Sequence, residues 1–243
     1  MDWACALCPS QSAQRSDDCA GVHRDVAGGC FPVTETPFWW RRHALNKQEF
    51  FDRLAASWDE EERPDIYERL ARVVSLSCLR GGHTVLDVGT GTGVLIPHIL
   101  RAVGERGVVV AIDISREMLR QARQKGFPPN VHLILADMQR AGFQPLVFDR
   151  VLCNAVFPHF DDKERALYEA WRVLRPGGLL VISHPIGREA VNRLHAQCRA
   201  VAEDRVPAAA RMYELLTRLG WSDVKVIDEP EFYLARARKR ELP

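Results

Sequence analysis

The stretch Thr84–Gly93, which reads TVLDVGTGTG, limits the fold of this chain more than any other segment. Its first half is a short apolar run interrupted only by Asp87, a pattern typical of a buried parallel strand. Three glycines at every second position, Gly89, Gly91 and Gly93, follow this run, and an apolar helical pattern begins directly after them. Because glycine has no Cβ, a ligand can lie directly against such a turn. The segment therefore predicts an α/β fold with a cofactor site at the end of this strand.

Two later apolar runs also end in an acid. Val108–Asp113 and Val131–Asp137 read as buried strands, and a helical pattern precedes each of them. Asp113 follows Gly93 by 20 residues, which is the reach of one helix and one strand. An acid at this position binds ribose hydroxyls in nucleoside-binding sheets. We therefore expect Asp113 to accept hydrogen bonds from the ribose of a bound nucleoside.

Composition and charge narrow the set of partners. The 243 residues include 33 Lys and Arg against 32 Asp and Glu, so no overall field directs the chain to nucleic acid or to a membrane. No apolar run reaches the roughly 20 residues that a membrane-spanning helix needs, and the first residues do not read as a secretion signal. Seven cysteines, an odd number, fit a reducing compartment better than a disulfide framework. We expect a cytoplasmic protein with a small-molecule partner, no nucleic-acid partner and no stable membrane insertion. The sequence does not determine the oligomeric state.

Residues 1–45 differ from the rest of the chain, since they hold four of the seven cysteines and show little periodicity. Their candidate metal ligands are Cys5, Cys8, Cys19, His23 and Cys30. The first two have the spacing of half a zinc or iron–sulfur site, but a zinc site normally has a second closely spaced pair. We therefore expect an irregular, cysteine-containing leader without a metal, followed by one domain over residues 46–243.

Several motifs resemble those of one enzyme family. The spacing G-x-G-x-G, with an acid in the preceding strand, differs from the G-x-G-x-x-G of dinucleotide-binding loops and resembles motif I of the class I methyltransferases that use S-adenosylmethionine. Asp113–Leu119, DISREML, resembles the family's D-x-S-x-x-M-L, and Asp137–Met138 resembles its motif III. Arg172–Leu180, RVLRPGGLL, resembles the turn into its fifth strand. Phe51–Asp59, FDRLAASWD, resembles the entry segment of the small-molecule branch that includes the ubiquinone/menaquinone C-methyltransferases. The resemblance covers about residues 48–238.

This resemblance implies that S-adenosylmethionine is the cofactor. It implies that the glycine loop carries the amino-acid part of the cofactor, that Asp113 binds the ribose and that Asp137 accepts a hydrogen bond from the adenine. Residues matching Ile114 and Met118 wall the adenine in the family, and the end of the fourth strand helps to place the amino-acid part. The implied cofactor-binding residues are Asp87, Gly89, Thr90, Gly91, Thr92, Gly93, Asp113, Ile114, Met118, Asp137, Met138 and Asn154.

Two histidines follow neighbouring predicted strands, His159 after the strand 148–155 and His184 at the end of the strand that the R-P-G-G turn begins. Ligands bind at this edge of an open α/β sheet, and imidazole titrates near neutrality. Either histidine is therefore a candidate catalytic residue that takes a proton from the methyl acceptor. The alternatives are that they orient loops, bind the acceptor or, less readily, hold a metal, and we predict no metal site. The apolar stripe of residues 188–203 predicts a helical cap over the acceptor pocket.

The last segments complete the predicted fold. Residues 221–228 and 231–238 alternate between apolar and polar side chains, which predicts an antiparallel hairpin. We expect an α/β protein with a Rossmann-like, doubly wound, seven-stranded sheet, mostly parallel with a C-terminal antiparallel hairpin. The predicted function is transfer of a methyl group from S-adenosylmethionine to a small, apolar or lipophilic acceptor by in-line displacement. Two alternatives remain: a catalytically silent S-adenosylmethionine-binding regulator, and an NAD-dependent oxidoreductase, against which the glycine spacing and the hairpin argue.

Overall fold

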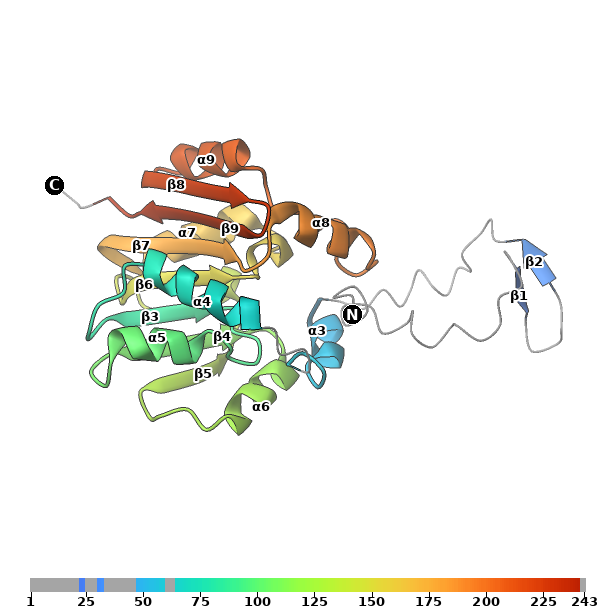
Figure 1. Cartoon of the computed structure of the whole chain (residues 1–243). Helices are drawn as coiled ribbons and strands as arrows, with labels where there is room; N and C mark the ends of the chain where they lie inside the picture. Colours follow the sequence, from blue (N-terminus) through green and yellow to red (C-terminus); the bar gives the residue numbers. More distant parts are fainter. Residues whose placement is uncertain (1–21, 25–29, 33–46, 60–63, 241–243) are drawn as a thin grey trace.

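The computed structural model describes only part of the chain, namely residues 22–24, 30–32, 47–59 and 64–240 (Figure 1). Within the predicted leader, β1 (Val22–Arg24) and β2 (Cys30–Pro32) form a short antiparallel pair. The predicted metal half-site at Cys5 and Cys8 lies outside the described residues. The leader of residues 1–45 therefore stays a prediction.

A seven-stranded sheet forms the centre of the molecule (Figure 1). Its strands are β3 (Thr84–Val88), β4 (Val108–Asp113), β5 (Val131–Leu135), β6 (Phe148–Asn154), β7 (Leu174–His184), β8 (Ser222–Glu229) and β9 (Phe232–Arg238). The order is β5-β4-β3-β6-β7-β9-β8, with parallel pairing from β5 to β7. β9 pairs antiparallel with both β7 and β8. This topology confirms the predicted α/β class and the mostly parallel sheet with its C-terminal antiparallel hairpin.

Helices cover both faces of this sheet (Figure 1). The helices of the described sheet region are α4 (Pro64–Leu76), α5 (Ile96–Val103), α6 (Arg116–Gln124), α7 (Lys163–Val173) and α9 (Ala209–Arg218), with the 3-10 turns η2 (Met138–Arg140) and η3 (Phe157–His159). Leu70 of α4 shares a buried cluster with Val85 of β3, whereas Leu167 of α7 shares a second cluster with the next strand residue, Leu86. Because successive strand residues face opposite sides, both faces of β3 are covered, which explains why the strand is apolar apart from Thr84 and Asp87. Within the described residues, no helix is both long and apolar enough to span a bilayer.

Two helical segments, α3 (Lys47–Leu54) and α8 (Arg188–Ala196), lie at the same end of the sheet (Figure 1). A third buried cluster joins α3 to the segment that follows α8, through Phe50 on the first and Val201 on the second. Met118 of α6 belongs to the same cluster. The two segments therefore form one cap, and it rests on a residue predicted to contact the cofactor.

The helix predicted over residues 188–203 ends early, at Ala196. The amides of Cys198, Val201 and Asp204 each donate to the carbonyl three residues earlier, at 2.9 to 3.1 Å. Such bonds make successive turns rather than an α-helix. They let Cys198 and Val201 both point into the buried cluster with α3, a tertiary contact that outweighs the helical stripe.

Side chains cap two of the helices. The Ser115 hydroxyl caps α6, because it accepts from the Met118 amide at 3.0 Å. Asp162 caps α7, because its side chain accepts from the Arg165 amide at 2.9 Å. The preceding acid, Asp161, instead forms an ion pair with Lys47 of α3 at 2.8 Å. Asp161 therefore connects the segment before α7 to α3.

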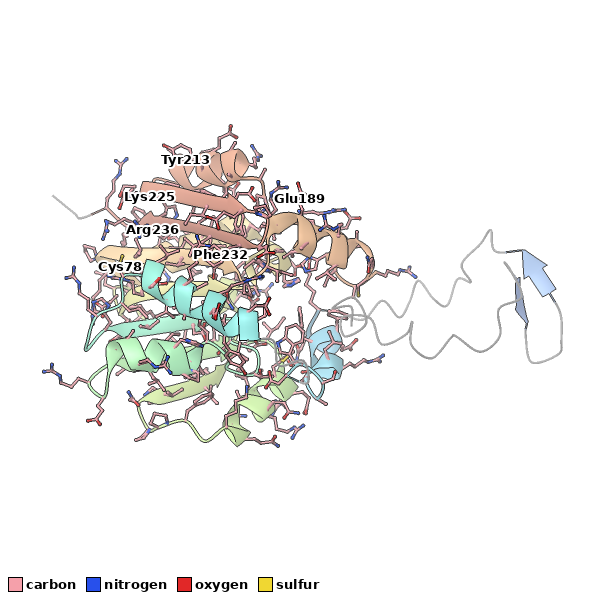
Figure 2. All side chains as sticks on the ribbon, in the orientation of Figure 1. Cys78, Glu189, Tyr213, Lys225, Phe232 and Arg236 are labelled. Carbon is pink, nitrogen blue, oxygen red and sulfur yellow. The ribbon has the colours of Figure 1, made fainter. Side chains whose placement is uncertain are left out.

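The C-terminal hairpin anchors α4 (Figure 2). The Arg72 guanidinium lies 4.2 Å from the ring centroid of Phe232 and donates two hydrogen bonds to Glu229, at 2.7 and 3.0 Å. Arg236 donates to the carbonyl of Leu76, the last residue of α4, at 3.1 Å. These contacts fix α4 against the sheet, which matters because α4 also forms one wall of the site described next.

Candidate functional site

A cavity of about 260 Å³ opens at the carboxyl ends of β3, β4 and β6. The predicted site residues that line it are Asp87, Gly89, Thr90, Gly91, Asp113, Ile114, Met118, Asp137, Met138, Asn154 and His159. They come from four separate sequence motifs, and the parallel sheet brings them to one edge. The predicted residues Thr92, Gly93 and His184 are not among the lining residues.

Gly91 and Gly93 serve different purposes in the turn after β3. A Cβ on Gly91, where φ is +55°, would meet only Trp58 Nε1 at 3.9 Å and Met118 Sδ at 4.0 Å. The backbone of Gly91 therefore borders open cavity space, as a ligand-binding glycine requires. A Cβ on Gly93 would lie 2.9 Å from the ring of Phe127, so this glycine permits close packing behind the loop.

Thr92 supports the loop from outside the cavity. Its hydroxyl donates to Asp59 Oδ1 at 2.6 Å, and Asp59 Oδ2 pairs with Lys125 at 2.7 Å. Asp59 closes the segment that begins with α3. Thr92 therefore ties the glycine loop to an acid that itself lines the cavity.

Asp113 is buried at the end of β4, with 8% of its surface exposed. Its Oδ2 accepts from the Gly91 amide and its Oδ1 from the Ser115 amide, both at 2.8 Å. Burial raises the pKa of Asp113, although these amides oppose the shift. Each carboxylate oxygen has capacity for a second donor, so the side chain can hold the glycine loop and still accept from ligand hydroxyls.

Asp87 is the most deeply buried acid of the cavity. It is 1% exposed, and the Thr90 hydroxyl donates to its Oδ2 at 2.6 Å. Burial, with a smaller contribution from the Asp113 charge, raises the pKa of Asp87 to about 7. A cationic ligand group beside Asp87 would remove this penalty, so the site favours an ammonium over a neutral or anionic group.

Asp137 lies at the start of η2, beyond the end of β5. Its Oδ1 accepts from the backbone amide of Gln139 at 2.9 Å and from the side-chain amide at 3.1 Å. Met118 and Met138, both nearly fully buried, lie in the same part of the lining. A carboxylate between apolar walls suits a flat heterocycle that carries an exocyclic amine.

The roof of the cavity is aromatic and apolar. Phe51 and Trp58 line it from the segment that begins with α3, and Ile66 and Tyr67 line it from α4. The Phe51 ring packs edge-on against Trp58 at 6.1 Å and against His159 at 5.0 Å between centroids. The entry segment therefore contacts the candidate base.

His159 lines the cavity from η3, close to the end of β6. Its Nδ1 lies 2.7 Å from Asp204 Oδ2, and the exposed fractions of the two side chains are 11% and 8%. Its ring centroid lies 4.9 Å from that of His195 on α8. His159 is thus held by a carboxylate that the sequence analysis did not single out.

His184, the other predicted histidine, ends β7 but is buried behind the cavity lining. Its Nε2 has no hydrogen-bond partner within the described part of the chain. Burial, and then the neighbouring His159 and His195, hold the pKa of His184 well below its ordinary value. The structure therefore separates the two candidates: His159 borders the cavity, and His184 forms part of its buried support.

Sequence reasoning missed several polar residues of this site, among them Lys47 and Asp204. Lys47 lines the cavity and donates to the carbonyl of His159 at 2.7 Å. Asp204 lies 45 residues from His159 in the sequence. No periodicity or motif spacing connects these positions, so only the folded cap brings them together.

Comparisons with known proteins agree on the class of fold. A methyltransferase-domain family model matches residues 86–182, from β3 to β7. The crystal structure of a S-adenosylmethionine-dependent methyltransferase from Aquifex aeolicus superposes with a TM-score of 0.64 at 24% identity, over 77% of this chain and 98% of that one. The [4+2]-cyclase SpnF superposes with a TM-score of 0.59 at 20% identity, over 72% of this chain and 82% of that one. These two likenesses concern the fold alone.

A sequence relative makes the relationship more specific. The ubiquinone/menaquinone biosynthesis C-methyltransferase UbiE of Vibrio vulnificus strain YJ016 is 37% identical over 142 residues, which are 55% of each chain. The chain thus spans about half the length of the curated relatives it matches. Residues 86–182 therefore resemble a methyltransferase domain, and the chain resembles UbiE; S-adenosylmethionine is the cofactor that this resemblance implies.

The residues of the cavity fit this cofactor. The buried Asp87 favours an ammonium group, Asp113 has free acceptor capacity for hydroxyls, and Asp137 offers an acceptor to an amine. The open space over Gly91 lets the ligand lie against the backbone.

Proposed function

We propose that this chain transfers a methyl group from S-adenosylmethionine to a small, apolar or lipophilic acceptor. The observation that carries the proposal is the convergence of Asp87, Gly91, Asp113 and Asp137 on one cavity whose roof is aromatic. When bound, S-adenosylmethionine supplies an electrophilic methyl carbon on a sulfonium. The protein residues then need to align the acceptor and exclude water.

In this proposal each acid holds one part of the cofactor. Asp87 takes the ammonium group, Asp113 the ribose hydroxyls and Asp137 the adenine amine, while Gly89 and Gly91 approach the amino-acid part. The remaining proposed contacts are Thr90, Ile114, Met118, Met138 and Asn154, all of which line the cavity. Thr92 and Gly93 act indirectly, by fixing the loop against Asp59 and Phe127.

The acceptor occupies the part of the cavity bordered by α3, α4 and η3. Phe51, Tyr67 and Phe160 give this part apolar walls, and His159 lies among them. Apolar walls favour an acceptor with a hydrophobic body, because its transfer from water is favourable. His159 is the proposed catalytic residue, and His184 supports it from behind.

We further propose that residues 46–243 act as one domain with residues 188–203 as part of its cap. The single sheet and the cluster between Phe50 and Val201 support this division. A cytoplasmic location and the lack of a nucleic-acid partner also remain proposals. Their support is the balanced charge of the chain and its odd number of cysteines, seven.

Calorimetric titration of the full chain with S-adenosylmethionine, S-adenosylhomocysteine and NADH tests the cofactor half. We expect micromolar binding of both sulfur nucleosides, at least tenfold weaker binding in Asp113→Asn, and no change in Glu105→Gln, which removes an exposed carboxylate. A screen of hydrophobic acceptors with methyl-labelled cofactor then tests turnover. NADH binding alone would contradict the proposal, and cofactor binding without any turnover would favour a silent regulator.

A further inference from the structure

The pair formed by His159 and Asp204 suggests how the candidate base is prepared. We propose that Asp204 is a positioning residue: it holds the His159 imidazole with the proton on Nδ1 and leaves Nε2 free to take a proton from the methyl acceptor. This inference rests on the proposed function and adds to it a second residue and a restriction on the acceptor.

The geometry of the pair determines the tautomer. A carboxylate only accepts hydrogen bonds, so the 2.7 Å contact between His159 Nδ1 and Asp204 Oδ2 requires the proton on Nδ1. Burial alone would raise the pKa of Asp204. The hydrogen bond and charge of His159, together with Lys47, instead hold the pKa of Asp204 below its ordinary value. Asp204 is therefore ionised at neutral pH and suited to stabilise an imidazolium.

The neighbours of Asp204 prevent it from turning away. Its Oδ1 pairs with Lys47 Nζ at 3.2 Å, its carbonyl accepts from His195 Nδ1 at 2.6 Å, and its amide donates to the Val201 carbonyl at 2.9 Å. Burial lowers the pKa of His195, which keeps a second positive charge away from the pair near neutrality. Backbone and side chain of Asp204 are thus fixed independently.

The backbone of His159 is held as firmly. Lys47 Nζ donates to the His159 carbonyl at 2.7 Å, and Lys163 Nζ donates to the carbonyls of Pro158 and Phe160 at 3.0 and 3.1 Å. With the backbone fixed and Nδ1 engaged, Nε2 is the nitrogen left for the acceptor. Precise placement of this kind is what a general base requires.

The proton balance restricts the acceptor to molecules whose nucleophilic atom carries a proton. That proton moves to Nε2 of His159, and the electron pair left on the acceptor forms the new bond to the methyl carbon as the carbon–sulfur bond breaks toward sulfur. Asp204 stabilises the imidazolium, which later releases its proton to solvent. Phenol-like or enol-like hydroxyls and acidic carbon atoms meet this condition, whereas thioethers and tertiary amines do not need a base.

Asp204 lies on the segment after α8, which packs against α3. The cluster that includes Phe50, Leu54, Cys198 and Val201 holds the two together. The packing of the cap therefore places Asp204 beside His159.

Nitrogen-detected NMR of the histidine side chains in the full chain tests the positioning role without any acceptor. We expect the Nδ1-protonated tautomer for His159, with the signal assigned through its loss in His159→Gln. Asp204→Asn should produce the other tautomer or a mixture, Asp204→Glu should retain the first, and Glu203→Gln, an exposed neighbour, should change nothing. An Nε2-protonated His159 in the unsubstituted protein, or an unchanged tautomer in Asp204→Asn, would overturn the inference.

Binding and kinetics separate this inference from the proposed function. S-adenosylhomocysteine affinity should stay within about twofold in Asp204→Asn, since Asp204 lies outside the cavity lining. Once an acceptor is known, kcat should fall at least tenfold in Asp204→Asn and about a hundredfold in His159→Gln. The variant that carries both substitutions should have the same kcat as His159→Gln alone. An additional loss in the double variant would show that Asp204 acts through the fold rather than through His159. Failure of cofactor binding in the unsubstituted protein would instead refute the proposed function and leave the tautomer result standing.

Discussion

Asp87→Asn should remove the pH dependence that the buried carboxyl group of Asp87 imposes on the free energy of unfolding. The unfolded chain ionises this group near its ordinary pKa of 3.8, whereas burial raises the pKa of Asp87 to about 7 in the folded protein. Between these values the folded state binds more protons than the unfolded state, so the free energy of unfolding falls as the pH rises. A difference of about 3 pKa units, at about 1.36 kcal/mol each, makes this loss about 4 kcal/mol by pH 8.

Urea unfolding of the cofactor-free chain measures the effect. We expect the stability of Asp87→Asn relative to the unsubstituted protein to rise by about 3 kcal/mol between pH 4.5 and pH 8, since the first part of the loss occurs below pH 4.5. Asparagine keeps the volume of the side chain and an oxygen that accepts from the Thr90 hydroxyl, so the variant should fold. Glu105→Gln removes an exposed acid and should show no such trend.

The result that would refute this reasoning is a constant difference. If the relative stability of Asp87→Asn changes by less than about 1 kcal/mol over that range, Asp87 ionises as freely in the cavity as in the unfolded chain. Its preference for an ammonium ligand would then lose its physical basis.

Three further predictions concern the glycine positions and the cofactor. Binding of S-adenosylhomocysteine near pH 7 should release about half a proton, because the ligand ammonium would lower the pKa of Asp87. Calorimetry in buffers of different ionisation enthalpy measures the number of protons released. An equal release in Asp87→Asn would contradict the prediction. Gly91→Ala should weaken the binding of S-adenosylhomocysteine at least tenfold, because the added methyl group enters the cavity. It should also lower the free energy of unfolding by about 1 kcal/mol, because φ of Gly91 is +55°. Unchanged affinity in the calorimeter would argue against contact between Gly91 and the ligand. Gly187→Ala should cost more than about 2 kcal/mol because its Cβ would overlap the Pro230 carbonyl, whereas Gly81→Ala, with its nearest neighbour at 3.9 Å, should melt almost as the unsubstituted protein does.

The cofactor half of the cavity could be predicted because its signals are local. Asp87 and Asp113 each end or interrupt a continuous apolar run, and runs of this kind become parallel strands in the centre of a sheet. Parallel strands bring their carboxyl ends to one edge, so the sequence also predicts that the acids meet there. Thr92 and Gly93 are the exceptions, since the Thr92 hydroxyl bonds Asp59 and Gly93 permits packing against Phe127.

The acceptor half could not be predicted to the same depth, because its contacts are made by tertiary packing. The apolar stripe after Arg188 resembles a continuing helix, but burial of Val201 against α3 ends the helix at Ala196. Only this change of direction brings Asp204 to His159. The same limit applies to His184, whose position at a strand end is visible in the sequence but whose burial behind the lining is not.

The helix α3 connects the two halves of the cavity. Asp52 accepts from the Ser115 hydroxyl at 2.6 Å, next to the proposed ribose acid, while Lys47 at the other end pairs with Asp204. Between them, Phe51 contacts His159 edge-on. One helix therefore contacts both the residue that caps α6 beside Asp113 and the pair of His159 and Asp204, so a displacement of α3 would disturb the cofactor half and the acceptor half together.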